Sequence, residues 1–339
     1  MSAGPNSAIG IAMLGCGRIS AAHIAAIQAQ PRNLNLVAVI DRDLGRAQQV
    51  ATRHGIPHAF GDLASALALG EIEAVLICTP NEMHTANSLE ALAAKRHVLV
   101  EKPMAENAAD ARRMADAAIA ANRILAVGHT FRHSAAVRYL QDHFADFGTL
   151  HSLEVSQCVF WDGPQAPWWA TRTREQGLIL SLFAPHALDF VQLVMRDEPL
   201  RVQAETARHQ SGWQGEDEAM ILLGYPGRRM ATVHVSYNQR RVVDRKTLLF
   251  DRGVLRLEDR DWLYWNDELV VGTPQGPGPE QRRMGGKDMA ACFETQLTEF
   301  VHAIRGQPHR SVLHEDGCRL IEIIDRIRRA ALVSNPLLD

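Results

Sequence analysis

The sequence predicts an α/β protein, in which a doubly wound parallel sheet is followed by a second domain with a mostly antiparallel sheet and helices. Three observations favour this fold. The first 130 residues alternate apolar, strand-like runs with alanine-rich helical runs, as parallel sheets with crossover helices do. A glycine turn follows the first apolar run, and beyond residue 145 the strands become longer and alternate apolar with polar side chains. A chain of 339 residues is too long to fold around one ordinary hydrophobic core, so we expect two domains, at 1–130 and 131–339.

The first domain is predicted to alternate strand and helix throughout. We expect strands near 8–14, 34–40, 58–60, 74–79, 97–101 and 124–128. We expect helices at about 18–29, 44–54, 62–69, 82–95 and 107–121. Pro31, Gly55 and Gly70 stand where helix breakers are usual. These elements make a complete doubly wound domain.

The second domain begins with a helical stretch near 134–145, and residues 155–161 then alternate in the manner of a strand with two different faces. Turn signals that predict hairpins lie at 225–227, 251–253 and 265–267. The glycine- and proline-rich residues 272–286 predict a mobile surface loop. We expect the last two helices, at about 288–305 and 315–333, to pack across the domain junction.

Composition excludes several classes of function. Lys and Arg total 36 against 39 Asp and Glu, so the net charge of −3 gives no reason to attract nucleic acid or anionic membrane. The five cysteines are far apart and include no CxxC pair, which favours a reducing cytoplasm. The first residues indicate neither a signal peptide nor a membrane span. His129 and His133 have the helical spacing of metal ligands, but no third ligand is fixed by spacing, so we predict no metal site.

The glycine turn has the residues that a dinucleotide needs. Gly15 permits the tight turn, Gly17 lets the backbone approach the pyrophosphate, and Arg18 and Ile19 lead into a small residue, Ser20, for helix packing. The alternative is a simple glycine turn. The next strand ends at Asp41, 24 residues after Gly17, where a carboxylate can accept hydrogen bonds from the adenosine ribose of NAD.

Two further interpretations of this second strand end stay open. Arg42, beside Asp41, could accommodate the 2′-phosphate of NADP, so NADP is possible. Asp41 could also be an ordinary N-cap of the helix that follows it.

Polar residues also follow the fourth and fifth strands. Thr79, Pro80 and Asn81 end the fourth strand, with His84 one helical turn further on, and we expect all four at the cofactor. The alternative is a strand-to-helix cap with turn residues. Lys102 follows Glu101 at the end of the fifth strand, where a desolvated lysine becomes a proton donor or acceptor near neutral pH. Its alternative is a solvated lysine paired with Glu101.

Thr79-Pro80-Asn81 with His84, the run 95–103, the run 127–132 and the run 313–317 together resemble the glucose-fructose oxidoreductase, inositol dehydrogenase and MocA family over nearly the whole chain. The resemblance implies an N-terminal Rossmann domain and a C-terminal α/β domain with a large open sheet. It also implies a nicotinamide cofactor, a sugar or cyclitol substrate, a cis peptide before Pro103, and oligomerisation through the open sheet, as a homodimer or homotetramer.

The resemblance implies a catalytic lysine at Lys102, with Glu101 at the cofactor, and a motif in which an aspartate precedes a histidine by four residues. His186 and Asp189 match that motif, but Leu182 occupies the aspartate position. One member of the acid and base set is therefore missing if the alignment holds.

The local sequence suggests how His186 could still work. Ser181 is a good N-cap, which would make Pro185 the fourth residue of a helix and place His186 near its start. The helix dipole there disfavours imidazolium, so a neutral His186 could act as a base. Leu182 would make the site drier and lower the pKa of Lys102. The alternative is a core histidine.

Aromatic and basic residues lie on the segment that leads to this motif. The tryptophans suit the C–H face of a sugar, and arginines suit hydroxyls or a carboxylate; they are Trp161, Trp168, Trp169, Arg172 and Arg174. We predict substrate contacts from Arg132, Trp168, Arg172 and Asp189. The alternatives are core tryptophans and solvated arginines.

The sequence thus predicts an NAD(P)-dependent oxidoreductase acting on a sugar, cyclitol or related polyhydroxy carbonyl compound. In this hypothesis His186 removes the hydroxyl proton and Lys102 orients and polarises the oxygen. Two alternatives remain: a lyase or glycosidase that retains NAD through a transient oxidation, and a cofactor-binding regulatory protein without catalysis.

Overall fold

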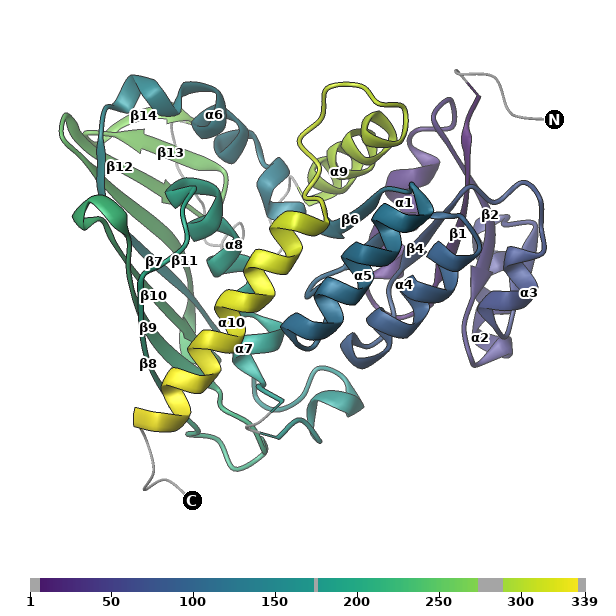
Figure 1. The fold of residues 1–339 in the computed structure, drawn as a ribbon, viewed down its shortest axis with the longest axis horizontal. Helices are drawn as coiled ribbons and strands as arrows, with labels where there is room; N and C mark the ends of the chain where they lie inside the picture. Colours follow the sequence, from purple (N-terminus) through teal and green to yellow (C-terminus); the bar gives the residue numbers. More distant parts are fainter. Residues whose placement is uncertain (1–6, 174–175, 274–288, 335–339) are drawn as a thin grey trace. The chain divides into compact units, whose positions relative to one another are not determined.

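The computed structural model describes residues 7–173, 176–273 and 289–334 (Figure 1). The chain divides into two compact units, one of which comprises residues up to Thr130 together with Ala290–Ile321. The other comprises Phe131–Met289 and the residues from Glu322 onward. Arg174 and nearly all of the predicted loop 272–286 lie outside the described residues. Among the described residues, no helix has the length and apolar character needed to cross a membrane.

The first unit contains the predicted parallel sheet of six strands, in the order β3-β2-β1-β4-β5-β6. Its strands are β1 (Ile9–Leu14), β2 (Leu34–Ile40), β3 (His58–Phe60), β4 (Ala74–Ile77), β5 (His97–Glu101) and β6 (Leu125–Gly128). The central strands are wholly buried, as β1, β4 and most of β5 show, because helices cover both faces of a doubly wound sheet. The strand order reverses between β1 and β4, which is where such folds bind ligands.

The helices of this unit that precede Thr130 lie within the predicted ranges, with ends that differ by at most two residues. They are α1 (Ser20–Gln28), α2 (Leu44–His54), α3 (Leu63–Leu67), α4 (His84–Ala93) and α5 (Ala108–Ala121), with a short 3₁₀ helix η1 (Asn81–Met83) before α4. Side chains of Asp43, Asp62 and Asn107 cap α2, α3 and α5. Asp43 caps α2, so the alternative interpretation of Asp41 as that cap is wrong.

The second unit contains an eight-stranded sheet in the order β14-β13-β12-β11-β7-β10-β9-β8. Its strands are β7 (Leu150–Phe160), β8 (Arg201–Ala207), β9 (Glu218–Gly224), β10 (Met230–Ser236), β11 (Asn238–Phe250), β12 (Gly253–Glu258), β13 (Trp262–Trp265) and β14 (Glu268–Val271). All neighbours are antiparallel except the pair β7 and β10. The predicted hairpins join β9 to β10, β11 to β12 and β13 to β14.

The two faces of this sheet differ in burial. On β9, Ala219, Ile221 and Leu223 are buried, whereas Met220 and Leu222 are exposed. The helix α8 (Ala184–Met195) packs on the buried face against β7 and β10, and Figure 1 draws the helices of this unit on one side of its sheet. We call the opposite side the outer face. It also carries Met230, Leu249 and Val254, all exposed.

Three further helices also follow the predicted ranges. They are α6 (Ala135–His143), α9 (Met289–Ile304) and α10 (His314–Ser334). In α10, Leu320, Ile323, Ile324 and Ile327 are buried at helical spacing. The division between the two units falls within α10, after Ile321.

The segment before His186 differs from the prediction. Ser181 is not an N-cap: it lies inside a one-turn helix, α7 (Ile179–Leu182), and its hydroxyl lies 2.9 Å from the Gln176 carbonyl, to which it donates. The next helix, α8, starts at Ala184, so Pro185 is its second residue rather than the predicted fourth. His186 still lies close to the helix start, as predicted.

A residue distant in sequence explains the difference. The Oε1 atom of Glu216 accepts the backbone N–H groups of Leu178 at 2.8 Å and Leu180 at 3.1 Å. A buried carboxylate therefore starts α7, and Ser181 is not needed as a cap. No local sequence signal indicates this contact, because Glu216 lies nearly forty residues away.

Candidate active site

The glycine turn after β1 approaches the end of β4 closely. Gly15 has φ +100°, and a Cβ there would lie 2.6 Å from the Cys78 carbonyl oxygen, so only glycine fits. A Cβ at Gly17 would meet nothing within 4 Å, which leaves its backbone accessible. The Ser20 hydroxyl donates to the Gly17 carbonyl at 2.6 Å and holds the turn at the start of α1. Arg18 and Ile19 are exposed beside it.

Asp41 ties the end of β2 to this turn. Its Oδ2 accepts the backbone N–H of Cys16 at 3.0 Å, and its Oδ1 accepts that of Asp43 at 2.9 Å. Each carboxylate oxygen retains a second lone pair, which suits the paired hydroxyls of a ribose. Arg46, an exposed residue on α2, lies 3.5 Å from Oδ2 and adds a positive charge that the sequence did not signal. Arg42 is also exposed.

The loop after β4 contains an amide that points to a ligand. Asn81 is buried, and its Nδ2 has no hydrogen-bond partner among the described residues. Thr79 accepts a hydrogen bond from Asn87 at 3.0 Å, and Thr79 and Pro80 are half-buried. The close glycine turn, the carboxylate of Asp41 and the unpartnered amide of Asn81 fit a dinucleotide across the β1 and β4 ends.

His84 connects two loops instead of facing outward. Its Nδ1 lies 2.7 Å from the Pro103 carbonyl and its Nε2 lies 2.9 Å from the Thr79 carbonyl. Burial lowers the pKa of His84 despite these two acceptors, and a neutral imidazole can donate to only one of them. His84 therefore ties the loop after β4 to the loop that contains Lys102.

Lys102 follows β5 and is half-buried. Burial lowers the pKa of its amine, the Glu101 carboxylate opposes that shift, and Arg18 adds to it. The Lys102–Pro103 peptide is cis, as the resemblance predicted. A lysine with a lowered pKa at the carboxyl end of a central strand is suited to donating or accepting a proton.

Glu101 has a partner that sequence reasoning missed. His23, fully buried on α1, places its Nε2 2.9 Å from Glu101 Oε1, while Glu101 Oε2 accepts the Lys102 N–H at 3.2 Å. Burial raises the pKa of Glu101, but the hydrogen bond and charge of His23, with those of Lys102, outweigh it and hold that pKa below its usual range. No motif near His23 in the sequence signals this contact, because the two residues are 78 positions apart.

In the second unit, His186 is half-buried at the start of α8 and stacks on Phe131. The two ring centres are 4.1 Å apart and the planes differ by 23°. Leu182 is buried at 6% exposure, so the motif position that should hold an aspartate is apolar in this chain.

Two predicted substrate residues bind each other. Arg132 and Asp189 form a buried pair in which Nε lies 2.9 Å from Oδ2 and Nη2 lies 2.7 Å from Oδ1. Arg172 is 2% exposed, and its guanidinium donates to the carbonyls of Gln176 and Gly177, each at 2.8 Å. These contacts favour internal bracing over substrate contact for the three residues.

The tryptophans divide between the core and the surface. Trp169 is buried, and Trp161 packs against it and against Phe183 and Tyr237. The alternative of core tryptophans therefore describes Trp169 best. Trp168 is half-buried, with the Arg172 guanidinium 6.0 Å from its ring centre.

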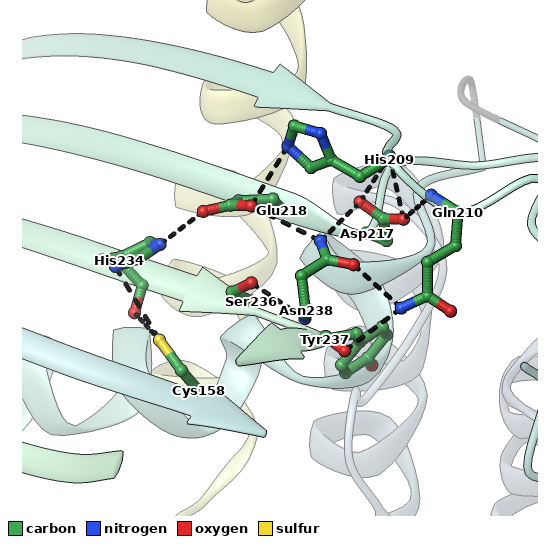
Figure 2. A network of polar contacts seen from close by, with 9 residues as sticks. All are labelled: Cys158, His209, Gln210, Asp217, Glu218, His234, Ser236, Tyr237 and Asn238. Carbon is green, nitrogen blue, oxygen red and sulfur yellow. Dashed lines mark hydrogen bonds and ion pairs between the residues drawn. The ribbon is translucent and has the colours of Figure 1, made fainter. Parts of the chain in front are cut away.

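A polar network at the end of the eight-stranded sheet was not predicted (Figure 2). Glu218 on β9 contacts two histidines, His234 at 2.8 Å and His209 at 3.2 Å. The Cys158 sulfur lies 3.8 Å from the other ring nitrogen of His234, but burial raises the pKa of that thiol to about 12, with Glu218 contributing. A thiol with so high a pKa is a poor nucleophile near neutral pH, and we assign no reaction to it.

The fold and the first unit's loops thus define a two-domain, dinucleotide-binding protein of the oxidoreductase class. Comparison with known proteins agrees: residues 9–129 match the family model described as "Oxidoreductase family, NAD-binding Rossmann fold", and residues 144–256 match the "GFO/IDH/MocA C-terminal domain". The chain belongs to the Gfo/Idh/MocA oxidoreductase family. It is an NAD(P)-dependent oxidoreductase of that family.

Relatives cover nearly its whole length. The trans-1,2-dihydrobenzene-1,2-diol dehydrogenase of Oryctolagus cuniculus is 30% identical, over 96% of this chain and 99% of the relative. The 1,5-anhydro-D-fructose reductase of Ensifer adhaerens is 26% identical, over 83% of this chain and 84% of the relative. A structure of levoglucosan dehydrogenase with NADH and levoglucosan superposes with a TM-score of 0.85, at 20% identity, over 97% of this chain and 98% of that one.

Proposed function

We propose that this chain is an NAD(P)-dependent dehydrogenase or reductase that acts on a CH–OH group of a sugar, cyclitol or related polyhydroxy carbonyl compound. The observation that carries the proposal is Lys102, whose amine has a lowered pKa at the end of β5, which only β4 separates from the strand before the dinucleotide turn, β1. The activities named for the diol dehydrogenase and the anhydrofructose reductase support this substrate class.

The cofactor is held, in this proposal, by residues of the first unit. They are Gly15, Gly17, Arg18, Ile19, Asp41, Arg42, Thr79, Pro80, Asn81, His84, Glu101 and Lys102. Asp41 favours the ribose of NAD, while Arg42 and Arg46 keep NADP possible because both offer positive charge near a 2′-phosphate. When bound, the nicotinamide supplies or accepts the hydride.

The chain's own groups handle the proton. We assign to His186 the removal of the hydroxyl proton during oxidation, and to Lys102 the orientation and polarisation of the same oxygen. Trp168, half-buried on the loop after β7, is the aromatic residue most suited to face a sugar ring. Arg132, Asp189 and Arg172 support the site through their internal contacts.

A screen of sugars, cyclitols and their keto forms with NAD and with NADP, read by nicotinamide absorbance, tests the proposal. We expect at least one polyhydroxy compound to change the absorbance in proportion to its own conversion. The absence of turnover with every member of the class, in protein that binds the cofactor, would contradict it.

Leu182 favours one second candidate. Because it replaces the motif aspartate and is buried, net oxidation loses one acid and base group, and a reaction that retains NAD through a transient oxidation becomes the alternative. Product formation without a net change in nicotinamide absorbance would identify this lyase or glycosidase chemistry.

We also propose that two copies associate through the outer face, as a homodimer or a homotetramer. Support comes from five exposed apolar side chains on that face: Met220, Leu222, Met230, Leu249 and Val254. We also propose a reducing, cytoplasmic compartment, because the five cysteines are far apart in sequence and include no CxxC pair.

A further inference from the structure

Phe131 lies between His186 and Arg260. Its ring centre is 4.1 Å from that of His186, and the Arg260 guanidinium carbon is 3.8 Å from the same ring centre. Two groups so close to one ring cannot share a face, so the imidazole and the guanidinium lie on opposite sides of the phenyl ring. The result is a stack of a cation, an aromatic ring and the imidazole to which we assign the proton.

The guanidinium at the back of this stack is firmly anchored. Arg260 is 7% exposed, and its Nε lies 2.8 Å from Oδ2 of Asp244, a buried residue of β11. The Ser134 hydroxyl donates to the Arg260 carbonyl at 2.9 Å. Asp244 also pairs with Lys246. If Arg260 moved away, the buried Asp244 carboxylate would keep only one of its two cations, which is costly in a buried site.

The backbone that presents Arg260 is held in an uncommon conformation. Asp259 has φ +48° and Arg260 has φ +69°, the left-handed region that residues other than glycine rarely adopt. The N–H of Asp259 donates to the Asp244 carbonyl at 2.8 Å and fixes this turn to β11. Two such residues in succession form the tight turn that joins β12 to β13.

Arg260 is the cation directly behind Phe131, and the neighbouring cations Arg132 and Lys246 are held in ion pairs. Arg132, next in sequence to Phe131, is paired with Asp189 of α8. Lys246 is paired with Asp244 and lies 5.7 Å from the ring centre of Phe190, on the same helix as His186. Burial raises the pKa of Asp244, but Lys246 and Arg260 outweigh it and keep that carboxyl ionised.

We propose that Phe131 and Arg260 are positioning residues for His186: Phe131 fixes the plane of the imidazole, and the Arg260 cation behind the ring disfavours its protonation. The inference rests on the proposed function only for the role of His186 as base, because the stack itself is a feature of this chain. A positive charge opposes a second one nearby, so Arg260 keeps the imidazole in the form that accepts a proton.

Two variants of Phe131 test the positioning. In Phe131→Leu an apolar side chain remains without a ring, whereas Phe131→Tyr keeps the ring. We expect kcat to fall about tenfold or more in Phe131→Leu, within the range of acid and base contributions, with cofactor affinity unchanged, and Phe131→Tyr to restore most of it. Ring-current shifts on the His186 protons should vanish in Phe131→Leu and persist in Phe131→Tyr, with His186→Gln used to assign the signals.

The charge effect is tested by Arg260→Met in histidine-labelled protein. The NMR titration midpoint of His186 should move to higher pH, by some tenths of a unit to about one unit, and the acidic limb of the kcat profile should move with it. Arg256→Met is the matched control, because Arg256 also lies over a ring, that of Tyr264 at 4.6 Å, in the same unit. It should leave the midpoint of His186 in place.

An unmoved or lowered midpoint in folded Arg260→Met would overturn the charge effect, and unaltered His186 shifts in Phe131→Leu would overturn the stack. If Arg260→Met fails to fold, Arg260→Lys, which keeps the charge but not the flat stack, must leave the midpoint near that of the wild type. Full turnover by His186→Gln would instead refute the assigned base, while the titration and the ring-current shifts would still judge the stack on its own.

Discussion

The guanidinium of Arg132 meets the carboxylate of Asp189 at two points inside the second unit, with Nη2 and Oδ1 2.7 Å apart. Their side chains are only 10% and 5% exposed. A buried pair of this geometry leaves a desolvated charge if either partner is removed. The pair also fixes α8, the helix of His186, to the 3₁₀ turn η2 (Thr130–His133) that bears Phe131.

Breaking this pair should destabilise the second unit strongly. We expect Asp189→Asn to lower the free energy of unfolding by about 3–5 kcal/mol, and Arg132→Met/Asp189→Leu to lose much less than the two single changes added together. Intrinsic fluorescence in urea measures this unit selectively, because all six tryptophans lie between residues 161 and 265. Additive losses would show that the two side chains are not coupled.

Asp41 should contribute directly to cofactor affinity. Asp41→Asn removes the charge that accepts the ribose hydroxyls, so NAD affinity measured by calorimetry should fall about tenfold or more. Asp43→Asn is the matched control: it changes a carboxylate two residues away but keeps an oxygen to cap α2 at the Arg46 N–H. Equal affinity losses in the two variants would argue that Asp41 does not contact the ribose.

His97 should make stability depend on pH. Burial, with Arg123 nearby, lowers its pKa from 6.5 to about 4, and its Nδ1 accepts the Ile124 N–H at 3.0 Å. Between these two values the unfolded chain binds a proton that the folded chain does not, so the free energy of unfolding falls as pH drops from about 6.5 to about 4. Urea unfolding at pH 7 and pH 5 should show a smaller difference in His97→Gln; an identical difference would contradict this source.

The parallel sheet was predictable because each signal in it is local. Apolar strand runs, breakers such as Gly55 and the glycine turn at Gly15 determine their own neighbourhood, and strand ends meet at one edge by topology. Contacts between distant residues were not predictable in the same way. Glu216, and not Ser181, binds the backbone N–H groups at the start of α7, although nothing near Ser181 in sequence signals the contact with Glu216.

The same distinction applies to the candidate site. The positions of Asp41, Asn81 and Lys102 at strand ends follow from the pattern of strands. In contrast, His23 contacts Glu101, Arg46 contacts Asp41 and Arg260 contacts Phe131 from helices or turns whose sequence carries no motif for these contacts. Long polar side chains pair with groups that lie near them in the folded chain. The residues next to them in sequence do not show which groups those are.

The outer face should control self-association. Met220 is 58% exposed and Leu249 is 44% exposed on that face, so Met220→Glu/Leu249→Glu should convert the assembly to monomers without unfolding it. Light scattering gives the molar mass directly, and Leu200→Glu, another exposed apolar position but outside the strands, is the control. Wild-type protein that is monomeric at micromolar concentration would contradict the proposed interface.

The proposed reaction depends on the amine of Lys102, which Lys102→Met removes while the side chain keeps much of its length. Turnover of a substrate found in the screen and the dissociation constant of NAD are measured on the same preparation. We predict that kcat falls by about 10²–10⁴-fold, while NAD binding stays within about threefold of the wild type because the other proposed cofactor residues still hold the dinucleotide. Turnover equal to that of the wild type, with intact NAD binding, would contradict the assignment of Lys102 as the catalytic lysine.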